Sequence, residues 1–595
     1  MSAVSGLPDR RQQQITIEIH DRRGTPRRRA SRITVDIPVT FQFKDRNFKA
    51  ICKDIGLGGI RIHSETLAPV GTKLVLQVSF NRNLSFMGFT GLVIHSEEML
   101  NGSVHPFYTL RLQFNHVGQV EEKVLESCIA ELAKAEYQTI AGETTSLSKK
   151  NIAMFVTDRA MNASQLVRRR VVITGIGVLS PIGNGRQAFA DGIKEGRSGV
   201  RRITRFDVKD LPVQIAAEIA NFDPSQYLSP KKLKQMDRCT QFAVSAALMA
   251  VADAKLDLEK MDRERVGGLI GTAIGGLRWA FEQNLVRHLG GSDKMNPYSM
   301  IATYPNAVSG QVSLELGLKG RTDTISSGCA SAGTAFGVAA EMIQRGELDV
   351  VVVGGTEDPV EPTVFGAMCA AGALSTMNEE PIRTPRPFDA ERDGPVLGEG
   401  AGVLIFEELE HALERGARIY AEFKGWGSTS DAFSLTRTDP GGAQAARAVH
   451  MALNDAGLVP GDIDYINAYG IATPSCDWAE ASVINQVFDG RGTKIPVSAI
   501  QSMTGYPWAA LGAFQLIANC VAITDGVIAP TINYAVPDPI CDLDVVPNQS
   551  RQLSVNTAMS NLFGCGKNVV LIVQQLHSGE EGHLRREVPC LKPTR

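Results

Sequence analysis

Short runs of alternating apolar and polar residues dominate the first part of the chain, up to about Gln138. In the run 31–43 the apolar residues recur at every second position, which places their side chains on one face of a strand. The same alternation recurs in 74–80 and 108–114. Several such strands with little helix between them predict a small antiparallel β-barrel, and apolar residues at four-residue steps over 120–132 predict a helix after it.

From Arg168 the pattern changes to short β-branched runs that end in glycine and are separated by helical stretches. The runs VVITGIG, LDVVVVGG and IDYINAYG are typical of buried strands, and TQFAVSAALMAVADA, between the first two, is typical of a helix. This order predicts an α/β domain in which helices cover both faces of a sheet.

These changes of pattern divide the chain into five parts. The parts are a basic arm (1–24), a β-barrel domain (25–138), a polar linker (139–167), an α/β domain (168–577) and a polar tail (578–595). We expect the α/β domain to consist of two halves, about 168–420 and 421–577.

Composition narrows the class of protein. The chain has 595 residues, of which 43% are apolar and 21% charged, as in globular proteins. A net charge of −3 argues against a protein that coats nucleic acid. The ten cysteines show no metal-ligand spacing, the first residues have no signal-peptide core, and no run reaches the roughly 18 apolar residues of a membrane span. We therefore expect a cytoplasmic protein without a metal centre, a membrane span or a nucleic-acid partner.

Two glycine-rich loops resemble nucleotide-binding motifs, and we reject both. VVITGIGVLS has Ser180 where a dinucleotide fingerprint needs its third glycine, and GCGKN has Asn568 where a phosphate loop needs Ser or Thr. No nucleotide cofactor is expected for catalysis.

The most informative segment is DTISSGCASAGTAFGVAAEMIQRGE, in which small residues surround Cys329 and a helical stretch follows it. A thiol at the N-terminus of a helix faces the positive end of the helix dipole, which favours the nucleophilic thiolate. The alternative is a buried, inert cysteine, which is the usual environment of a free thiol.

Residues 168–577 resemble the β-ketoacyl-acyl-carrier-protein synthases of the type II class, which adopt the thiolase fold. The matching blocks, in order, are RRRVVITGIGVLSPIGNG, SSGCASAG, PFDAERDGPVLGEGAGVLIFEELEHALERGA, NAYGIATPSCDWAEA and SMTGYP. The resemblance implies duplicated α-β-α-β-α layers. It also implies that Cys329 accepts an acyl group from the phosphopantetheine of an acyl carrier protein, and that the backbone N–H groups of Cys329 and Cys565 form the oxyanion hole.

The chain departs from the family pattern where the acid–base groups are expected. Tyr469 and Tyr506 stand at the positions of the two catalytic histidines. Gln501 replaces the supporting lysine and Gln515 replaces a glutamate, whereas Thr473, a pantetheine contact in the family, is kept. Four charged or titratable groups have thus become neutral together, which indicates a repurposed site, because no unpaired buried charge remains.

These departures affect the two half-reactions of the family differently. Acyl transfer to Cys329 needs a thiolate and an oxyanion hole, which the chain retains. Decarboxylative condensation also needs donors for the enolate, and the loss of one oxyanion donor costs about 10²–10³ in rate. We therefore expect crippled condensation, with Tyr469, Tyr506 and Gln501 serving beside Cys329 in an atypical acyltransferase of fatty-acid or polyketide-type biosynthesis. The remaining histidines of this domain are expected to lie away from Cys329.

The N-terminal domain resembles the PilZ domain, a small barrel that binds cyclic di-GMP. Its RxxxR motif is matched by Arg28 and Arg32, and its [DN]xSxxG motif by Asp54 and Gly59, with Gly56 in place of the serine. Guanidinium groups suit phosphates and stack on guanine. The resemblance implies regulation by cyclic di-GMP, and the alternative is a solvated basic arm.

Three cations, Lys231, Lys234 and Arg238, match the carrier-docking region of the family, although an ordinary solvated helix start has the same composition. The resemblance further implies a homodimer, or a heterodimer with another ketosynthase. The rival hypothesis is a non-condensing partner similar to a chain-length factor, or an acyl-binding regulator. The lost histidines favour this rival, and the retained Cys329 argues against it.

Overall fold

The structure is a computed structural model. It describes the backbone of six strands between residues 33 and 116, and residues 168–576 apart from 435, 489–493 and 565. The chain divides into two compact units, Met1–Val167 and Arg168–Arg595. The predicted arm, linker, tail and the helix expected over 120–132 lie outside the described residues.

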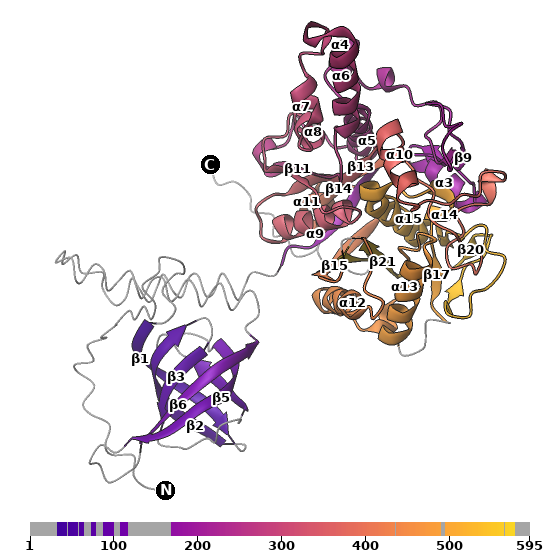
Figure 1. Cartoon of the computed structure of the whole chain (residues 1–595). Helices are drawn as coiled ribbons and strands as arrows, with labels where there is room; N and C mark the ends of the chain where they lie inside the picture. The colour runs from indigo at the N-terminus through magenta and orange to yellow at the C-terminus, as the bar shows by residue number, and fades with distance from the viewer. Residues whose placement is uncertain are drawn as a thin grey trace. The chain divides into compact units, whose positions relative to one another are not determined.

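The six strands of the N-terminal unit close into an antiparallel barrel of order β1-β2-β3-β6-β5-β4 (Figure 1). The strands are β1 (Ile33–Phe43), β2 (Arg46–Gly56), β3 (Gly59–Ser64), β4 (Lys73–Val78), β5 (Met87–Met99) and β6 (Phe107–His116). The alternation at 31–43, 74–80 and 108–114 thus corresponds to β1, β4 and β6, as the period-two pattern predicts.

The C-terminal unit is built on a 12-stranded sheet of order β12-β11-β13-β14-β7-β15-β22-β21-β16-β17-β19, with β8 paired to β7. The strands of its first half are β7 (Val171–Ser180), β8 (Gly183–Asn184), β11 (Val266–Gly271), β12 (Thr322–Ile325), β13 (Val350–Glu357) and β14 (Gly400–Glu408). Those of its second half are β15 (Ala421–Ser430), β16 (Tyr465–Asn467), β17 (Pro496–Ser498), β19 (Asp544–Val545), β21 (Thr557–Gly564) and β22 (Lys567–Gln574). Two short ribbons pair β9 (Arg201–Arg202) with β10 (Ile215–Ala216), and β18 (Val527–Ile528) with β20 (Arg551–Gln552).

Helices on three levels cover the two halves of this sheet. The inner helices α9 (Ser331–Gln344) and α15 (Leu511–Asp525) contact each other and strands of both halves. The helices α5 (Arg238–Asp253) and α8 (Ala307–Leu316) pack on the first half, whereas α12 (Ala443–Ala456) packs on the second and carries α13 (Pro474–Val487) beside it. The unit is therefore layered α-β-α-β-α, and the two halves repeat one plan (Figure 1).

The other helices are shorter or more peripheral. They are α3 (Arg186–Glu195), α4 (Pro230–Leu233), α6 (Leu277–Gly290), α7 (Ser299–Thr303), α10 (Pro362–Ala370), α11 (Leu409–Glu414) and α14 (Gln501–Thr504).

The inner helix α15 is buried on all sides, because it contacts strands of both halves of the sheet. Every residue from Leu511 to Ile523 is buried. The stretch Trp508–Asp525 has the length and hydropathy of a membrane span, but 83% of it is buried inside the fold. We therefore assign it to the protein core.

Three residues singled out by the sequence lie in loops that follow strands of the sheet. Cys329 lies between β12 and α9, Tyr469 follows β16, and Tyr506 lies between β17 and α15. The strands β11, β12 and β13 run parallel, as do β16, β17 and β21. Loops at the carboxyl ends of such strands are a usual position for functional groups.

Candidate active site

Cys329 lies two residues before the first residue of α9 and is 8% exposed. Its turn is held by Ser331, whose hydroxyl donates to the carbonyl of Gly328 at 2.5 Å and accepts from the backbone N–H of Ser327 at 3.0 Å. Gly328 has a φ of +62°, a conformation that favours glycine. The thiol therefore sits at the positive end of a buried 14-residue helix, as the sequence predicts.

Tyr469 and Tyr506 meet in the protein interior, and their hydroxyl groups hydrogen-bond to each other. The two rings are nearly perpendicular, at 87°, with their centroids 5.9 Å apart. Both side chains are buried. The two tyrosines that the sequence singles out thus form one hydroxyl pair.

Gly564, at the end of β21, shows that this pair lies beside the nucleophile. A Cβ atom at Gly564 would lie 2.6 Å from the Tyr469 hydroxyl oxygen and 3.0 Å from Cβ of Cys329. The fold therefore brings Cys329 and Tyr469 together at one glycine. Cys565, the predicted second donor of the oxyanion hole, lies outside the described residues, directly after Gly564.

Gln501 and Gln515 bind main-chain carbonyls of the segment that ends at Tyr469. The amide nitrogen of Gln501 donates to the carbonyl of Tyr469, and to that of Ala468 at 3.2 Å. The amide nitrogen of Gln515 donates to three carbonyls, those of Asn467 (3.3 Å), Ala468 (2.7 Å) and Asn561 (3.1 Å). Both glutamines are buried, so this support is neutral.

Glu480 holds the same loop through its backbone N–H groups, a role that the sequence analysis missed because Glu480 stands out only by its place in a matching block. Its carboxylate accepts the N–H groups of Tyr469 and Gly470, both at 2.8 Å, and the side-chain amide of Asn561 at 3.0 Å. Burial raises the pKa of Glu480. A carboxylate bound by three donors fixes the backbone on which Tyr469 stands.

Asp477, one turn earlier on α13, binds the backbone of a different segment, at Phe388. Its carboxylate accepts the N–H of Phe388 at 2.9 Å and faces the guanidinium of Arg392 at 3.2 Å. Phe388 has a φ of +64°, and its ring approaches the Cα of Gly470 so closely that a Cβ there would lie 2.9 Å away. Burial raises the pKa of Asp477 to about 7.

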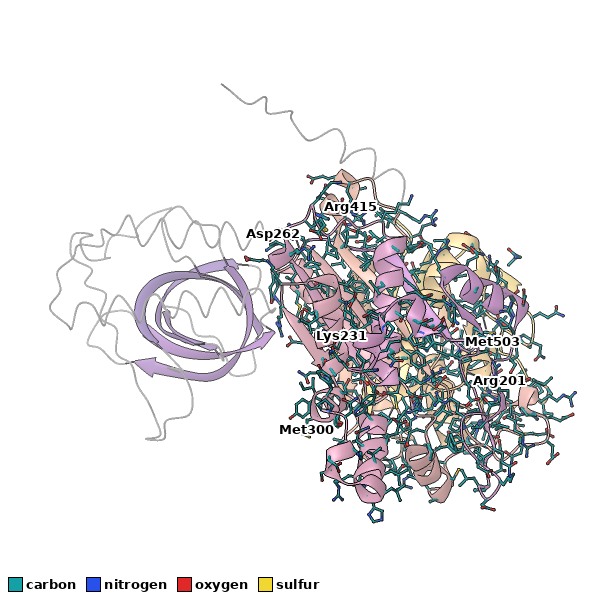
Figure 2. The ribbon with its side chains drawn as sticks, turned by 90° about the horizontal axis from the view of Figure 1, so that it is seen from above. Arg201, Lys231, Asp262, Met300, Arg415 and Met503 are labelled. Carbon is teal, nitrogen blue, oxygen red and sulfur yellow. The ribbon has the colours of Figure 1, made fainter. Side chains whose placement is uncertain are left out.

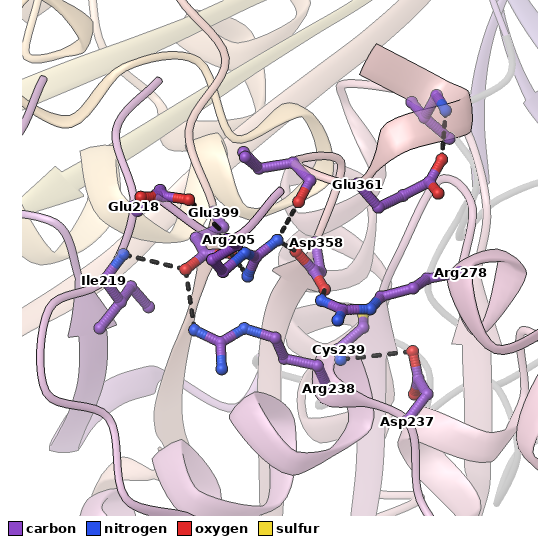
Figure 3. A network of polar contacts seen from close by, with 12 residues as sticks. Arg205, Glu218, Ile219, Asp237, Arg238, Cys239, Arg278, Asp358, Glu361 and Glu399 are labelled. Atoms are coloured by element: carbon purple, nitrogen blue, oxygen red, sulfur yellow. Dashed lines mark hydrogen bonds and ion pairs between the residues drawn. The ribbon is translucent and has the colours of Figure 1, made fainter. Parts of the chain in front are cut away.

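Tyr506 is supported through its backbone by the segment before β14. Its N–H donates to the carbonyl of Val396 at 2.8 Å, and its carbonyl accepts from Gly398 at 3.1 Å. Glu399, the next residue, belongs to a buried group of three arginines and three carboxylates (Figure 3). The members of this ionic cluster are Arg205, Glu218, Arg238, Arg278, Asp358 and Glu399.

Arg205 is the centre of the ionic cluster. It binds Glu399 at 2.5 Å and Asp358 at 2.9 Å, and Arg278 of α6 binds Asp358 at 2.9 Å. Burial raises the pKa of Glu399 to about 7, and the neighbouring charge of Asp358 adds to that. Burial opposes ionisation of Asp358 as well, but Arg205 and Arg278 keep the pKa of that carboxyl below its ordinary value.

The three predicted docking cations differ in exposure. Lys231 and Lys234 are exposed, and Lys231, labelled in Figure 2, belongs to α4. Arg238 instead points inward, where it binds Glu399 at 3.0 Å and stacks on the ring of Phe242 at 4.6 Å. Arg238 is therefore engaged with a buried carboxylate while its side chain stays 22% exposed, and its role in docking stays a prediction.

The remaining predicted residues are placed as follows. Thr473 is half-buried and immediately precedes α13. Asp54, Gly56 and Gly59 lie at the β2–β3 hairpin, where Gly56 pairs with Gly59. Arg28 and Arg32 lie outside the described residues.

The described histidines of the C-terminal unit lie in other surroundings. His288 and His450 are exposed on α6 and α12. His411 binds Glu407 at 2.6 Å, and this hydrogen bond raises the pKa of His411. These three histidines are therefore exposed or bound to another partner.

Comparison with protein families assigns both units. Residues 168–412 match the beta-ketoacyl synthase N-terminal domain, residues 420–535 match the C-terminal domain of the same family, and residues 26–131 match the PilZ domain. The resemblances inferred from the sequence are thereby confirmed.

Curated relatives and solved structures agree with this assignment. The chain is 41% identical over 409 residues to a 3-oxoacyl-[acyl-carrier-protein] synthase 2 of Synechocystis sp., covering 69% of this chain and 98% of the relative. It is 42% identical over 399 residues to the protein of the same name from Coxiella burnetii, covering 67% and 96%.

Among solved structures, the ishigamide ketosynthase/chain length factor matches with a TM-score of 0.64 and 36% identity, over 69% of this chain and all of that one. A beta-ketoacyl synthase from Burkholderia phymatum STM815 matches with a TM-score of 0.65 and 34% identity, again over 69% of this chain and all of that one. The predicted fold class is confirmed by these neighbours.

Proposed function

The chain belongs to the beta-ketoacyl synthase family, and from this membership we propose that it is an acyltransferase of fatty-acid or polyketide-type biosynthesis. Cys329 takes the acyl group from an acyl carrier protein as a thioester. Phosphopantetheine on the carrier is the only prosthetic group involved, Thr473 contacts it, and the reaction takes place in the cytoplasm.

The observation that carries this proposal is the setting of Cys329. The thiol lies at the N-terminus of α9, beside a glycine whose missing side chain lets the Tyr469 hydroxyl donor come close to Cys329. Acyl transfer to a thiolate needs this nucleophile and an oxyanion hole, which Cys329 and Cys565 supply through their backbone N–H groups.

Decarboxylative condensation is disfavoured by the same geometry. The hydroxyls of Tyr469 and Tyr506 bind each other, and Gln501 binds main-chain carbonyls. Enolate stabilisation would therefore have to rely on a hydroxyl pair in place of two imidazoles. We propose that Tyr469 and Tyr506 are oxyanion donors and that Gln501 positions the loop of Tyr469.

Intact-protein mass spectrometry tests the proposal. The full chain is incubated with medium- and long-chain acyl carrier proteins, beside Cys329→Ala. An acyl adduct on the wild type alone is expected. Absence of any adduct from folded protein would contradict an acyltransferase and favour a regulator.

The PilZ match supports regulation by cyclic di-GMP, with Arg28, Arg32 and Asp54 as contacts and with Gly56 and Gly59 in the β2–β3 hairpin. Titration calorimetry on the full chain should give a binding heat that Arg28→Ala weakens. No heat from the wild type would make this unit an adaptor.

We further propose that Lys231 and Lys234 dock the carrier protein, and that the protein is a homodimer or pairs with another ketosynthase. The dimer is supported by β12, an edge strand whose residues are only half-buried, and by Leu314 of the adjacent α8, which is 77% exposed. Met300 of α7, 64% exposed and labelled in Figure 2, adds to this apolar surface. Analytical ultracentrifugation measures the mass directly.

The second candidate function is a non-condensing partner similar to a chain-length factor, or an acyl-binding regulator. It is favoured by the mutual hydrogen bond of the tyrosines, which fills the histidine positions, and by the ketosynthase/chain length factor neighbour. In that case Cys329→Ala should leave the biological effect of the protein intact.

A further inference from the structure

We propose that the acyl group on Cys329 is passed to a thiol, such as the pantetheine thiol of a second carrier, and not to a carbanion, an amine, an alcohol or water. This inference rests on the proposed acyl-enzyme and names its acceptor class. Its physical basis is the set of groups that the fold places around Cys329.

The possible acceptors differ in what they require from the site. Water, alcohols and ammonium ions must lose a proton before or during attack, and this needs a general base. A malonyl-derived carbanion needs strong donors for its enolate oxygen. A thiol of ordinary pKa near 8.5 is already a few per cent thiolate at pH 7, and the thiolate is intrinsically a strong nucleophile. Thiols alone in this series need no base.

The described side chains around Cys329 match the least demanding acceptor. One hydroxyl proton of the Tyr469–Tyr506 pair lies between the two oxygens, so that the pair offers at most one donor to a substrate. Phenols ordinarily titrate near 10, which makes them poor bases at neutral pH. One hydroxyl donor is enough to assist the oxyanion that forms on the acyl carbonyl, and thioester exchange needs no other help from the pair.

The nearby amides and carboxylate are already engaged in holding the backbone. Gln501 and Gln515 donate to carbonyls of the Tyr469 loop. Glu480 accepts from the N–H groups of Tyr469 and Gly470 and from an amide of Asn561. Each of these three side chains is thus already committed to holding the loop, and none is assigned the role of accepting a proton from an attacking group.

The exchange balances without a further reactant. The acceptor thiolate attacks the acyl carbonyl and forms a carbon–sulfur bond, and the oxygen takes the negative charge. When the electron pair on this oxygen re-forms the carbonyl, the carbon bond to the Cys329 sulfur breaks and Cys329 leaves as a thiolate. No proton is gained or lost, and the departing thiolate returns to the N-terminus of α9, where the dipole favours it.

Acyl-enzyme prepared from the full chain and acyl carrier protein, freed of donor, tests the acceptor class. Portions are chased with N-acetylcysteamine, with ethanolamine, with buffer alone and with malonyl-carrier protein, and the loss of the adduct is followed by mass. A free acyl thioester treated with the same thiol gives the uncatalysed rate.

We expect only the thiols to empty Cys329, at least about 100-fold faster than the uncatalysed exchange, which is the size of one oxyanion donor. The rate should rise about tenfold per pH unit between pH 6 and pH 8, with the thiolate fraction. The double variant Tyr469→Phe, Tyr506→Phe should lose this acceleration while a thermal melt shows it folded.

Release by malonyl-carrier protein with loss of CO₂, or release by amine or water at the thiol rate, would overturn the inference and leave the proposed function standing. An adduct that persists in thiol would overturn it in the same way. Failure to form any adduct from folded protein would overturn both.

Discussion

At the scale of single residues, the site depends on the two hydroxyl groups that meet beside Cys329. Each tyrosine can donate to a substrate only when the other donates the bond between them, since a hydroxyl has a single proton. The pair can therefore offer one hydroxyl proton to a substrate, while the other proton stays in the bond between the two oxygens.

Replacing one tyrosine by phenylalanine should accordingly cost less than replacing both. We expect Tyr469→Phe or Tyr506→Phe to slow acylation of Cys329 by about 10-fold, and the double variant by about 10²–10³, the cost of a lost oxyanion donor. Rapid-quench mass spectrometry gives the rates, and circular dichroism controls for folding. An unchanged rate in the double variant would remove the hydroxyls from the mechanism.

Gly564 is a second position at which a single added carbon atom should affect acylation. The Cβ of Gly564→Ala would lie within 3.0 Å of both the Tyr469 hydroxyl oxygen and the Cys329 Cβ, closer than unstrained atoms approach. We expect acylation to be lost with a modest fall in thermal stability. Gly366→Ala, in α10 with nothing within 4 Å of the added Cβ, is the matched control and should keep both. Equal acylation in the two variants would mean that the space at Gly564 is not needed.

At the scale of secondary-structure elements, α13 organises the site with two carboxylates on its buried face. Asp477 and Glu480 are three residues apart and reach back to backbone N–H groups of Phe388, Tyr469 and Gly470. A helix thus fixes a loop that has positive φ at Gly470 and Ala472.

Glu480→Gln keeps the shape of the side chain but turns an NH₂ group toward a backbone N–H. The expected result is a loss of about 1–3 kcal/mol in the free energy of unfolding, the cost of an unsatisfied buried donor, together with slower acylation. Urea denaturation measures the first effect. Glu379→Gln, at an exposed position, serves as control and should stay within about 0.5 kcal/mol of the wild type. Two indistinguishable variants would contradict the role of Glu480.

At the scale of the whole molecule, the layered fold buries several carboxyl groups whose protonation differs from that of the unfolded chain. Burial raises the pKa of Glu357 to about 8 and that of Asp477 to about 7. The folded state therefore keeps protons that the unfolded state releases above its ordinary pKa of about 4.5. Stability should fall as the pH rises through this interval.

We expect the melting temperature to decrease steadily from pH 5.5 to pH 8.5. Glu357→Gln, which cannot ionise, should flatten this dependence, because Glu357 has the higher of the two values. Differential scanning calorimetry across the range measures it. A stability that increases over the same interval would mean that these carboxyls are ionised in the fold.

The sequence predicted much of the fold because its signals were local. The alternation at 31–43 corresponds to β1, and the runs before Gly177, Gly354 and Gly470 correspond to β7, β13 and β16. It also named Cys329, Tyr469 and Tyr506, since their motifs flank strands and helices that the fold brings together.

Other features could not be predicted, because they depend on where a side chain points. Arg238 was assigned to the surface from a basic run, yet a buried partner, Glu399, lies 161 positions away in the chain and draws it inward. Glu480 was overlooked since a glutamate in a helix is ordinarily a solvated residue, and only the three donors around it reveal its role.

The amide nitrogen of Gln515, which three carbonyl oxygens surround, limits which side chains position 515 accepts. A mutation of Gln515 to glutamate would set a carboxylate oxygen against those carbonyls. Glutamine and glutamate have nearly the same shape, so position 515 excludes the acid by electrostatic repulsion and not by size.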